Sequence, residues 1–116
     1  MFVIDLKPVS EGQLLHVLEY TWAEPVTVAE IFVLLSEQST KSVPLYMKMI
    51  DTEQECVFDR PYLDTGYLSC FPAIAGSKLH ISLLTSQDEP QLVSIAGLNI
   101  YSSYNLITQT ESPLTI

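Results

Sequence analysis

Hydrophobic and polar residues alternate along most of the chain, a period of two that is typical of strands with one buried face. The pattern is clearest in residues 26–35, 42–51 and 77–86. The apolar positions of these segments are Ala29, Ile31, Val33, Leu35, Val43, Leu45, Met47, Met49, Leu79, Ile81 and Leu83. We expect these side chains to form the core of a sheet protein.

Residues that favour turns separate the alternating segments at intervals of about ten residues. Among these turn signals are residues 23–25, 51–54 and 76–77. This spacing predicts an all-β fold, a single antiparallel β-sandwich that is jelly-roll-like and has about eight strands. We expect residues 1–116 to form one β-sandwich domain.

A helix is the main alternative for residues 27–38. Thr27 and Glu30 have the spacing of a capping box, which begins many helices. The segment is rich in β-branched and aromatic residues, however, and these favour a strand. We therefore predict a strand here.

Charged residues make up 16% of the chain, against roughly 25% in typical globular proteins. A surface with so few charges is often partly covered by another protein. Protein partners are therefore expected, with the chain acting as a homo-oligomer or as a subunit of a larger assembly.

The net charge is −9, from 14 acidic and 5 basic residues. So few basic residues cannot form the patch that binds phosphates, so neither nucleic acid nor an anionic membrane is an expected partner. An acidic inhibitor or immunity-type protein that covers a basic surface remains an alternative.

The chain shows neither a signal peptide nor a membrane helix. Its longest apolar run, residues 31–35, is far shorter than the ~20 residues that a membrane helix needs. The first residues lack the basic and apolar regions of a secretory signal. We therefore expect a protein that is made in the cytoplasm, where it can be incorporated into a virion.

The two cysteines, Cys56 and Cys70, have neither CxxC spacing nor a nearby histidine, so a zinc site is not indicated. Without an export signal, we predict two reduced and buried thiols. A disulfide between neighbouring strands is the alternative.

Carboxylates are concentrated in residues 51–64, and Asp51, Glu53 and Glu55 occupy alternate positions there. In an extended chain their side chains would point the same way, as candidate ligands of calcium. The segment lacks the glycine and the aspartate spacing of a calcium loop. We therefore favour an exposed hairpin tip between two arms, residues 46–50 and 56–60.

Tyrosines flank two short turns. Tyr62 and Tyr67 flank "LDT", and Tyr101 and Tyr104 flank "SS". Tyrosine next to serine and asparagine is typical of contact surfaces and of sugar-binding faces. These four tyrosines are the candidate partner-binding residues, and the alternative is that they pack as cross-strand pairs.

No catalytic residue is predicted. His16 and His80 lie in alternating segments without an adjacent nucleophile, although either cysteine could meet His80 in space. Glu19, Glu30 and Asp59 could supply the paired carboxylates of a glycosidase, but 116 residues would be unusually few for one. We predict that the protein is not an enzyme and needs no cofactor.

The predicted function is therefore a non-enzymatic module for protein–protein assembly. Within that class we favour a small structural or accessory subunit of a larger particle, such as a phage or virus virion. A carbohydrate-binding module with a structural calcium ion in residues 51–64 is a second hypothesis, and the acidic inhibitor is a third.

Overall fold

The computed structural model describes residues 2–6, 15–39, 43–58, 60–84, 91–103, 105–109 and 114–115. The strands are β1 (Phe2–Leu6), β2 (Leu15–Leu35), β3 (Val43–Met49), β4 (Gln54–Glu55), β5 (Tyr62–Leu63), β6 (Gly66–Leu84), β7 (Gln91–Ser102), β8 (Asn105–Gln109) and β9 (Leu114–Thr115). All paired strands are antiparallel. The predicted all-β antiparallel fold is confirmed, and residues 27–35 lie in a strand. Among the described residues, no helix is long and apolar enough to cross a membrane.

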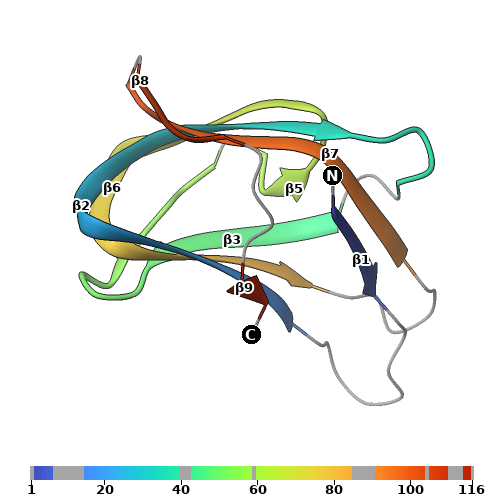
Figure 1. The fold of residues 1–116 in the computed structure, drawn as a ribbon, viewed down its shortest axis with the longest axis horizontal. Helices are drawn as coiled ribbons and strands as arrows, with labels where there is room; N and C mark the ends of the chain where they lie inside the picture. Colours follow the sequence, from blue (N-terminus) through green and yellow to red (C-terminus); the bar gives the residue numbers. More distant parts are fainter. Residues whose placement is uncertain are drawn as a thin grey trace.

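One continuous sheet contains all these strands, in the order β1-β7-β2-β6-β3-β4. Three short strands pair outside this order: β5 with β3, β8 with β7 and β9 with β2. The strands at the two ends, β1 and β4, do not pair with each other, so the sheet is not closed. The sandwich and the jelly-roll topology are therefore not confirmed. Instead, the single sheet curls over itself (Figure 1).

The curl comes from a shared bend in the two longest strands. β2 contains 21 residues and β6 contains 19. Their register shifts between Thr21 and Val26 and again between Val28 and Glu30 of β2. Such irregularities bend the strand that contains them. The prediction of turns at residues 23–25 and 76–77 was wrong, because the chain bends there without leaving the sheet.

The bend places the core between two layers of the same sheet (Figure 1). In the lower layer, β3 pairs with the second half of β6, which pairs with the first half of β2. In the upper layer, β7 pairs with the second half of β2, which pairs with the first half of β6. The buried apolar side chains include Leu18, Val28, Ile31, Val33, Val43, Leu45, Met47, Met49, Leu68, Leu79, Ile81, Leu83, Val93, Ile95, Leu98 and Ile100. Most of the predicted core positions are therefore confirmed.

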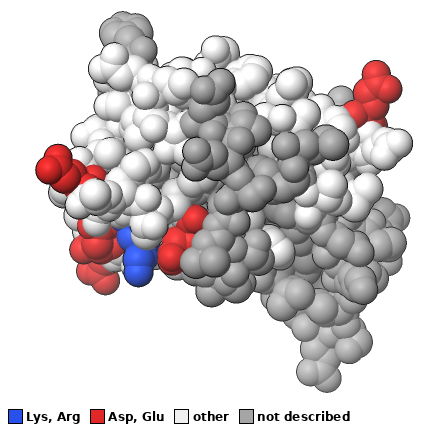
Figure 2. Space-filling model, viewed as in Figure 1, with Lys and Arg blue, Asp and Glu red and all other residues white. Residues whose placement is uncertain are grey.

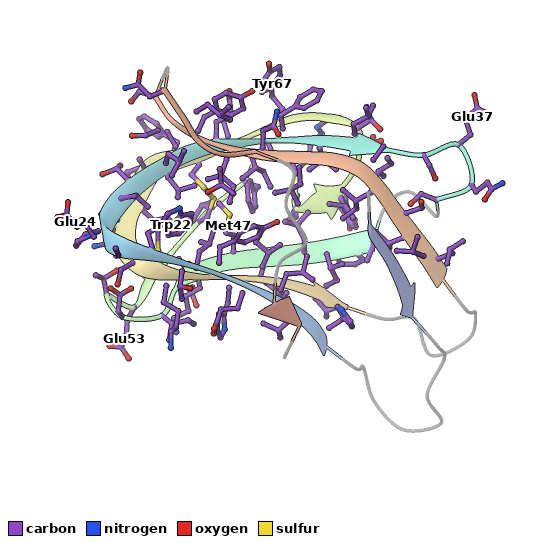
Figure 3. All side chains as sticks on the ribbon, viewed as in Figure 1. Trp22, Glu24, Glu37, Met47, Glu53 and Tyr67 are labelled. Atoms are coloured by element: carbon purple, nitrogen blue, oxygen red, sulfur yellow. A yellow bond between two sulfur atoms is a disulfide. The ribbon has the colours of Figure 1, made fainter. Side chains whose placement is uncertain are left out.

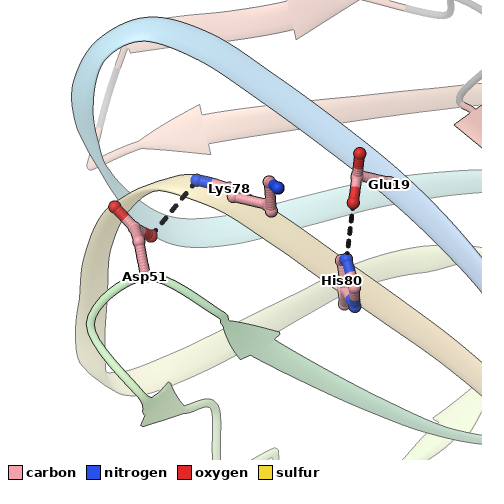
Figure 4. A network of polar contacts seen from close by, with 4 residues as sticks. All are labelled: Glu19, Asp51, Lys78 and His80. Atoms are coloured by element: carbon pink, nitrogen blue, oxygen red, sulfur yellow. Dashed lines mark hydrogen bonds and ion pairs between the residues drawn. The ribbon is translucent and has the colours of Figure 1, made fainter.

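The turn after β3 is fastened to β6 at the bend. The carboxylate of Asp51 accepts a hydrogen bond from the backbone N–H of Lys78 at 3.2 Å (Figure 4). It accepts another from the backbone N–H of Ser77 at 2.9 Å. It also accepts one from the Ser77 hydroxyl at 2.9 Å. A Cβ atom on the buried Gly76 would lie 2.5 Å from this carboxylate and 3.0 Å from the Met49 sulfur. The close approach therefore requires glycine at position 76.

Two further contacts hold the same turn. The side-chain oxygen of Gln54 accepts a hydrogen bond from the backbone N–H of Ala75 at 2.9 Å. The hydroxyl of Thr52 donates a hydrogen bond to the backbone carbonyl of Ala75. The predicted hairpin tip is the β3–β4 turn, and it is tethered to the bend. Its second arm is Gln54–Glu55 and not residues 56–60 as predicted, since residues 56–58 lie outside the strands.

A disulfide joins Cys56 to Cys70, with their Cα atoms 5.2 Å apart. Cys56 follows β4 at the margin of the lower layer, and Cys70 is buried in the upper half of β6. The prediction of two reduced thiols was wrong. The curl of the sheet brings the two positions together, although the residues are 14 apart in the sequence.

The Gly76 contact predicts a specific energetic coupling. Gly76→Ala should lower the free energy of unfolding by about 1–3 kcal/mol, because the new methyl group displaces Asp51 or Met49. The loss should be smaller in an Asp51→Ala background, which removes the nearest clashing atom. Urea denaturation of the two single variants and the double variant gives the coupling. Strictly additive losses would contradict this explanation.

The disulfide predicts a loss of stability on its removal. The double variant Cys56→Ser/Cys70→Ser should be about 2–4 kcal/mol less stable than the oxidised protein, since a loop of this length no longer restricts the unfolded chain. Denaturation of the wild-type chain with and without dithiothreitol measures the same loss of stability. The stability of the double variant should not change with the reductant. Equal stability of both proteins would show that the bridge constrains nothing.

Candidate functional site

Three aromatic rings cluster on the outer face of the upper layer. Phe32 of β2 is the register partner of Tyr67 of β6, and their ring centroids are 4.8 Å apart. The ring of Tyr67 is also 6.1 Å from the ring of Tyr101 of β7. Figure 3 shows Tyr67 pointing outward from the upper layer. We call Phe32, Tyr67 and Tyr101 the aromatic face.

Exposed apolar side chains extend the aromatic face. Leu34 follows Phe32 on the same side of β2, and 44% of its surface is exposed. Leu106 of β8 is the register partner of Tyr101 and is 47% exposed. Phe71 of β6 is 88% exposed. Apolar exposure is therefore spread over strands β2, β6 and β8 around the rings.

The polar groups beside the rings are mostly paired with each other. The hydroxyl of Ser69 donates a hydrogen bond to the carboxylate of Glu30 at 3.2 Å. The amide of Asn99 donates one to the hydroxyl of Tyr101 at 3.4 Å. Among the described residues that pair in register with Phe32, Tyr67 or Tyr101, Glu30 is the single one with a charged side chain. In Figure 2 the acidic side chains that can be seen lie mainly at the bend end, and one more lies at the opposite end of the molecule.

The four predicted partner-binding tyrosines have different outcomes. Tyr67 and Tyr101 meet in the aromatic face. Tyr62 is 49% exposed but lies in β5, where it pairs with Pro44. Tyr104 is outside the described residues. Phe32 was not predicted as a surface residue of the site. Its place in residues 26–35, on the side opposite the core positions, does indicate that its ring lies on the outer face.

The outer face of the lower layer contains a pocket of about 160 Å³, which we call the polar pocket. Its lining residues are Tyr46, Met47, Lys48, Ile50, Glu55, Cys56, His80 and Ser82. They are brought together by strand register, since Lys48 pairs with both His80 and Glu55, and Tyr46 pairs with Ser82. The pocket thus lies across β3, β4 and β6, beside the bend.

A row of ionisable side chains crosses this face, formed by Glu19, His80, Lys48 and Glu55. The Nε2 atom of His80 is 2.7 Å from a carboxylate oxygen of Glu19 (Figure 4). Both side chains are largely shielded from solvent, with 21% and 14% exposed. No ion pair joins Lys48 to Glu55 in the described part of the chain.

The candidate metal ligands do not form a group. Within the described ranges, no three histidine, cysteine, aspartate or glutamate side chains lie together so that they could hold a metal ion. Asp51 is bound to the backbone of β6, and these hydrogen bonds lower the pKa of its carboxyl group. Glu53 and Glu55 are exposed. The structure therefore does not assemble the calcium site considered for Asp51, Glu53 and Glu55.

Among the described residues, the catalytic alternatives are not brought together either. Both cysteines belong to the disulfide, so neither provides a thiol to His80. Glu19 is bonded to His80 on the lower layer, whereas Glu30 is bonded to Ser69 on the upper layer. Asp59 is outside the described residues.

Comparisons with protein-family models, with curated proteins and with solved structures give no significant match. The function is therefore argued from the two surfaces themselves.

The remaining histidine, His16, is partly buried, and its Nε2 atom has no hydrogen-bond partner among the described residues. Burial lowers the pKa of His16, because desolvation disfavours the imidazolium form. The folded protein therefore binds a proton at this position less readily than the unfolded chain does. Burying the neutral imidazole of His16 therefore has no protonation cost above the unfolded pKa of about 6.5. As the pH falls below that value, the unfolded chain takes up the proton first and the free energy of unfolding declines.

His16 should therefore make the protein more sensitive to acid. Between pH 7.5 and pH 5.5, the wild-type chain should lose more unfolding free energy than His16→Gln, which keeps a polar side chain that does not titrate. Urea denaturation of both proteins at the two pH values provides the measurement, and His80 is common to both. An equal loss in both proteins would assign the acid sensitivity to other groups.

Proposed function

We propose that this protein is a non-enzymatic assembly module that contacts other protein subunits through the aromatic face. The observation that carries the proposal is the cluster of Phe32, Tyr67 and Tyr101 on an outward face of the sheet. Exposed leucines at its margins enlarge the apolar area. Groups of exposed apolar side chains mark interaction sites on soluble proteins.

The chemistry of the aromatic face suits protein contact. Tyrosine rings give a large contact area with few rotatable bonds, so little entropy is lost on binding. Strand pairing and ring contacts already restrict Phe32, Tyr67 and Tyr101. Central aromatic residues often contribute most of the affinity of an interface. The face is therefore organised before a partner arrives.

The distribution of charge favours the aromatic face as the contact between two copies of the chain. Two molecules of net charge −9 repel each other, most strongly where acidic side chains approach. The rows that hold the rings contain Glu30 alone among charged described residues, and Ser69 already binds it. Self-association through this face keeps the acidic bend end away from the contact.

The larger role that we favour is a structural or accessory subunit of a particle such as a phage or virus virion. The low charged fraction of 16% supports it. The Cys56–Cys70 bridge also supports it, because disulfides persist at virion surfaces and in other oxidising surroundings. In that role, the folded-over sheet would act as a jelly-roll-like sandwich.

Self-association should depend on the aromatic face. Sedimentation or light scattering over a concentration series should give masses above the 13.0 kDa of one chain. Tyr67→Ala should weaken association by about tenfold or more, the effect of a central aromatic residue. Tyr62→Ala is the matched control, since Tyr62 is similarly exposed but lies in β5, and it should have no effect. A wild-type chain that stays monomeric, or equal effects of both variants, would contradict the proposal.

A further inference from the structure

We propose that the polar pocket binds one unit of a neutral sugar. The pocket lies on the outer face of the lower layer, whereas the aromatic face lies on the upper layer. The inference therefore does not depend on the proposed function. It rests on an exposed ring, on polar side chains without partners and on the balance of charge.

The aromatic part of the pocket is Tyr46. It is 62% exposed and shares one side of β3 with Lys48, and Ile50, in the turn after β3, also lines the pocket. A sugar ring has C–H groups on its faces, and these can lie against the face of a tyrosine ring. Because Tyr46 is held on a paired strand, the ring is available without a change in the backbone.

The polar part of the pocket supplies both donors and acceptors. In the described part of the chain, Lys48, Glu55 and Ser82 make no side-chain hydrogen bond or ion pair, yet all three line the pocket. Lys48 donates hydrogen bonds, Glu55 accepts them and Ser82 does both. Sugar hydroxyls also donate and accept, so one small ligand can satisfy all three side chains.

The balance of charge selects a neutral ligand. Lys48 is flanked across the strands by Glu55 and by His80, which is held by Glu19. A phosphate or sulfate would find one lysine and two nearby carboxylates, which is an unfavourable field. An organic cation would have to compete with the ammonium group of Lys48 for the same carboxylates. A neutral polyhydroxylated ligand avoids both costs.

The size of the pocket sets the scale of the ligand. About 160 Å³ is below the 300–1,000 Å³ typical of drug-sized ligands, so it suits a single sugar unit. A ligand of so few atoms is bound weakly, with a dissociation constant on the order of 1 mM. The test must therefore detect weak binding.

Saturation-transfer difference NMR on the full chain meets this requirement. The probes are glucose, galactose, mannose and N-acetylglucosamine, each added in excess, with inorganic phosphate and tetramethylammonium added separately. The binding variants are Tyr46→Ala, Lys48→Ala and Glu55→Ala. Tyr62→Ala is the matched control, because it removes an exposed tyrosine outside the pocket.

At least one sugar should give a transfer signal from its ring protons. Tyr46→Ala should weaken its binding by about tenfold or more, and Lys48→Ala and Glu55→Ala should each weaken it severalfold. Tyr62→Ala should bind as wild type. Circular dichroism and urea denaturation should show that all four variants stay folded, which is expected because none of these side chains is buried.

Three results would overturn the proposal. They are silence from every sugar, sugar binding that Tyr46→Ala leaves unchanged, and binding of phosphate or tetramethylammonium in place of the sugars. Tyr67→Ala separates this proposal from the previous one, since it should reduce self-association and leave sugar binding intact. A chain that binds sugar as a monomer would support the pocket and contradict the assembly proposal.

Discussion

The shared bend in β2 and β6 is the constraint on which the structure depends. Strands of 21 and 19 residues are much longer than the 3–10 residues usual in globular proteins. In a flat sheet, their apolar sides would need a second layer from elsewhere in the chain. The bend turns one side of the sheet onto itself, so a single sheet covers its own core. At the bend, the β3–β4 turn lies close against β6, because Asp51 is hydrogen-bonded to β6 and Gly76 has no side chain in the way.

The same bend separates two outward surfaces of different chemistry. β2 contributes Phe32 to the aromatic face and, on the other side of the bend, Glu19 to the ionisable row. β6 likewise contributes Tyr67 to one and His80 to the other. Changes that disturb the bend should therefore reach both surfaces, whereas changes at one surface should leave the other intact.

The disulfide acts at the side of the fold that strand pairing leaves open. The first half of β6 pairs with β2, while β3 pairs with the second half of β6. The Cys56–Cys70 disulfide links the segment after β4, beside the lower layer, to the first half of β6 in the upper layer. The bridge and the Asp51 tether thus both act on the segment after β3, one on each side of β4, and this segment contributes Ile50, Glu55 and Cys56 to the polar pocket.

The alternation of apolar residues was enough to predict strands, antiparallel pairing and most of the core, because the period of two is a local property of the chain. The tyrosines beside short turns also singled out Tyr67 and Tyr101, whose rings meet in the aromatic face. The sequence pattern did not reveal that residues 23–25 and 76–77 bend within strands, because a local turn signal does not say whether the flanking segments stay in one sheet. Nor did it pair the cysteines or place Phe32 between the tyrosines. Those outcomes depend on the register between strands far apart in the sequence, which only the tertiary structure decides.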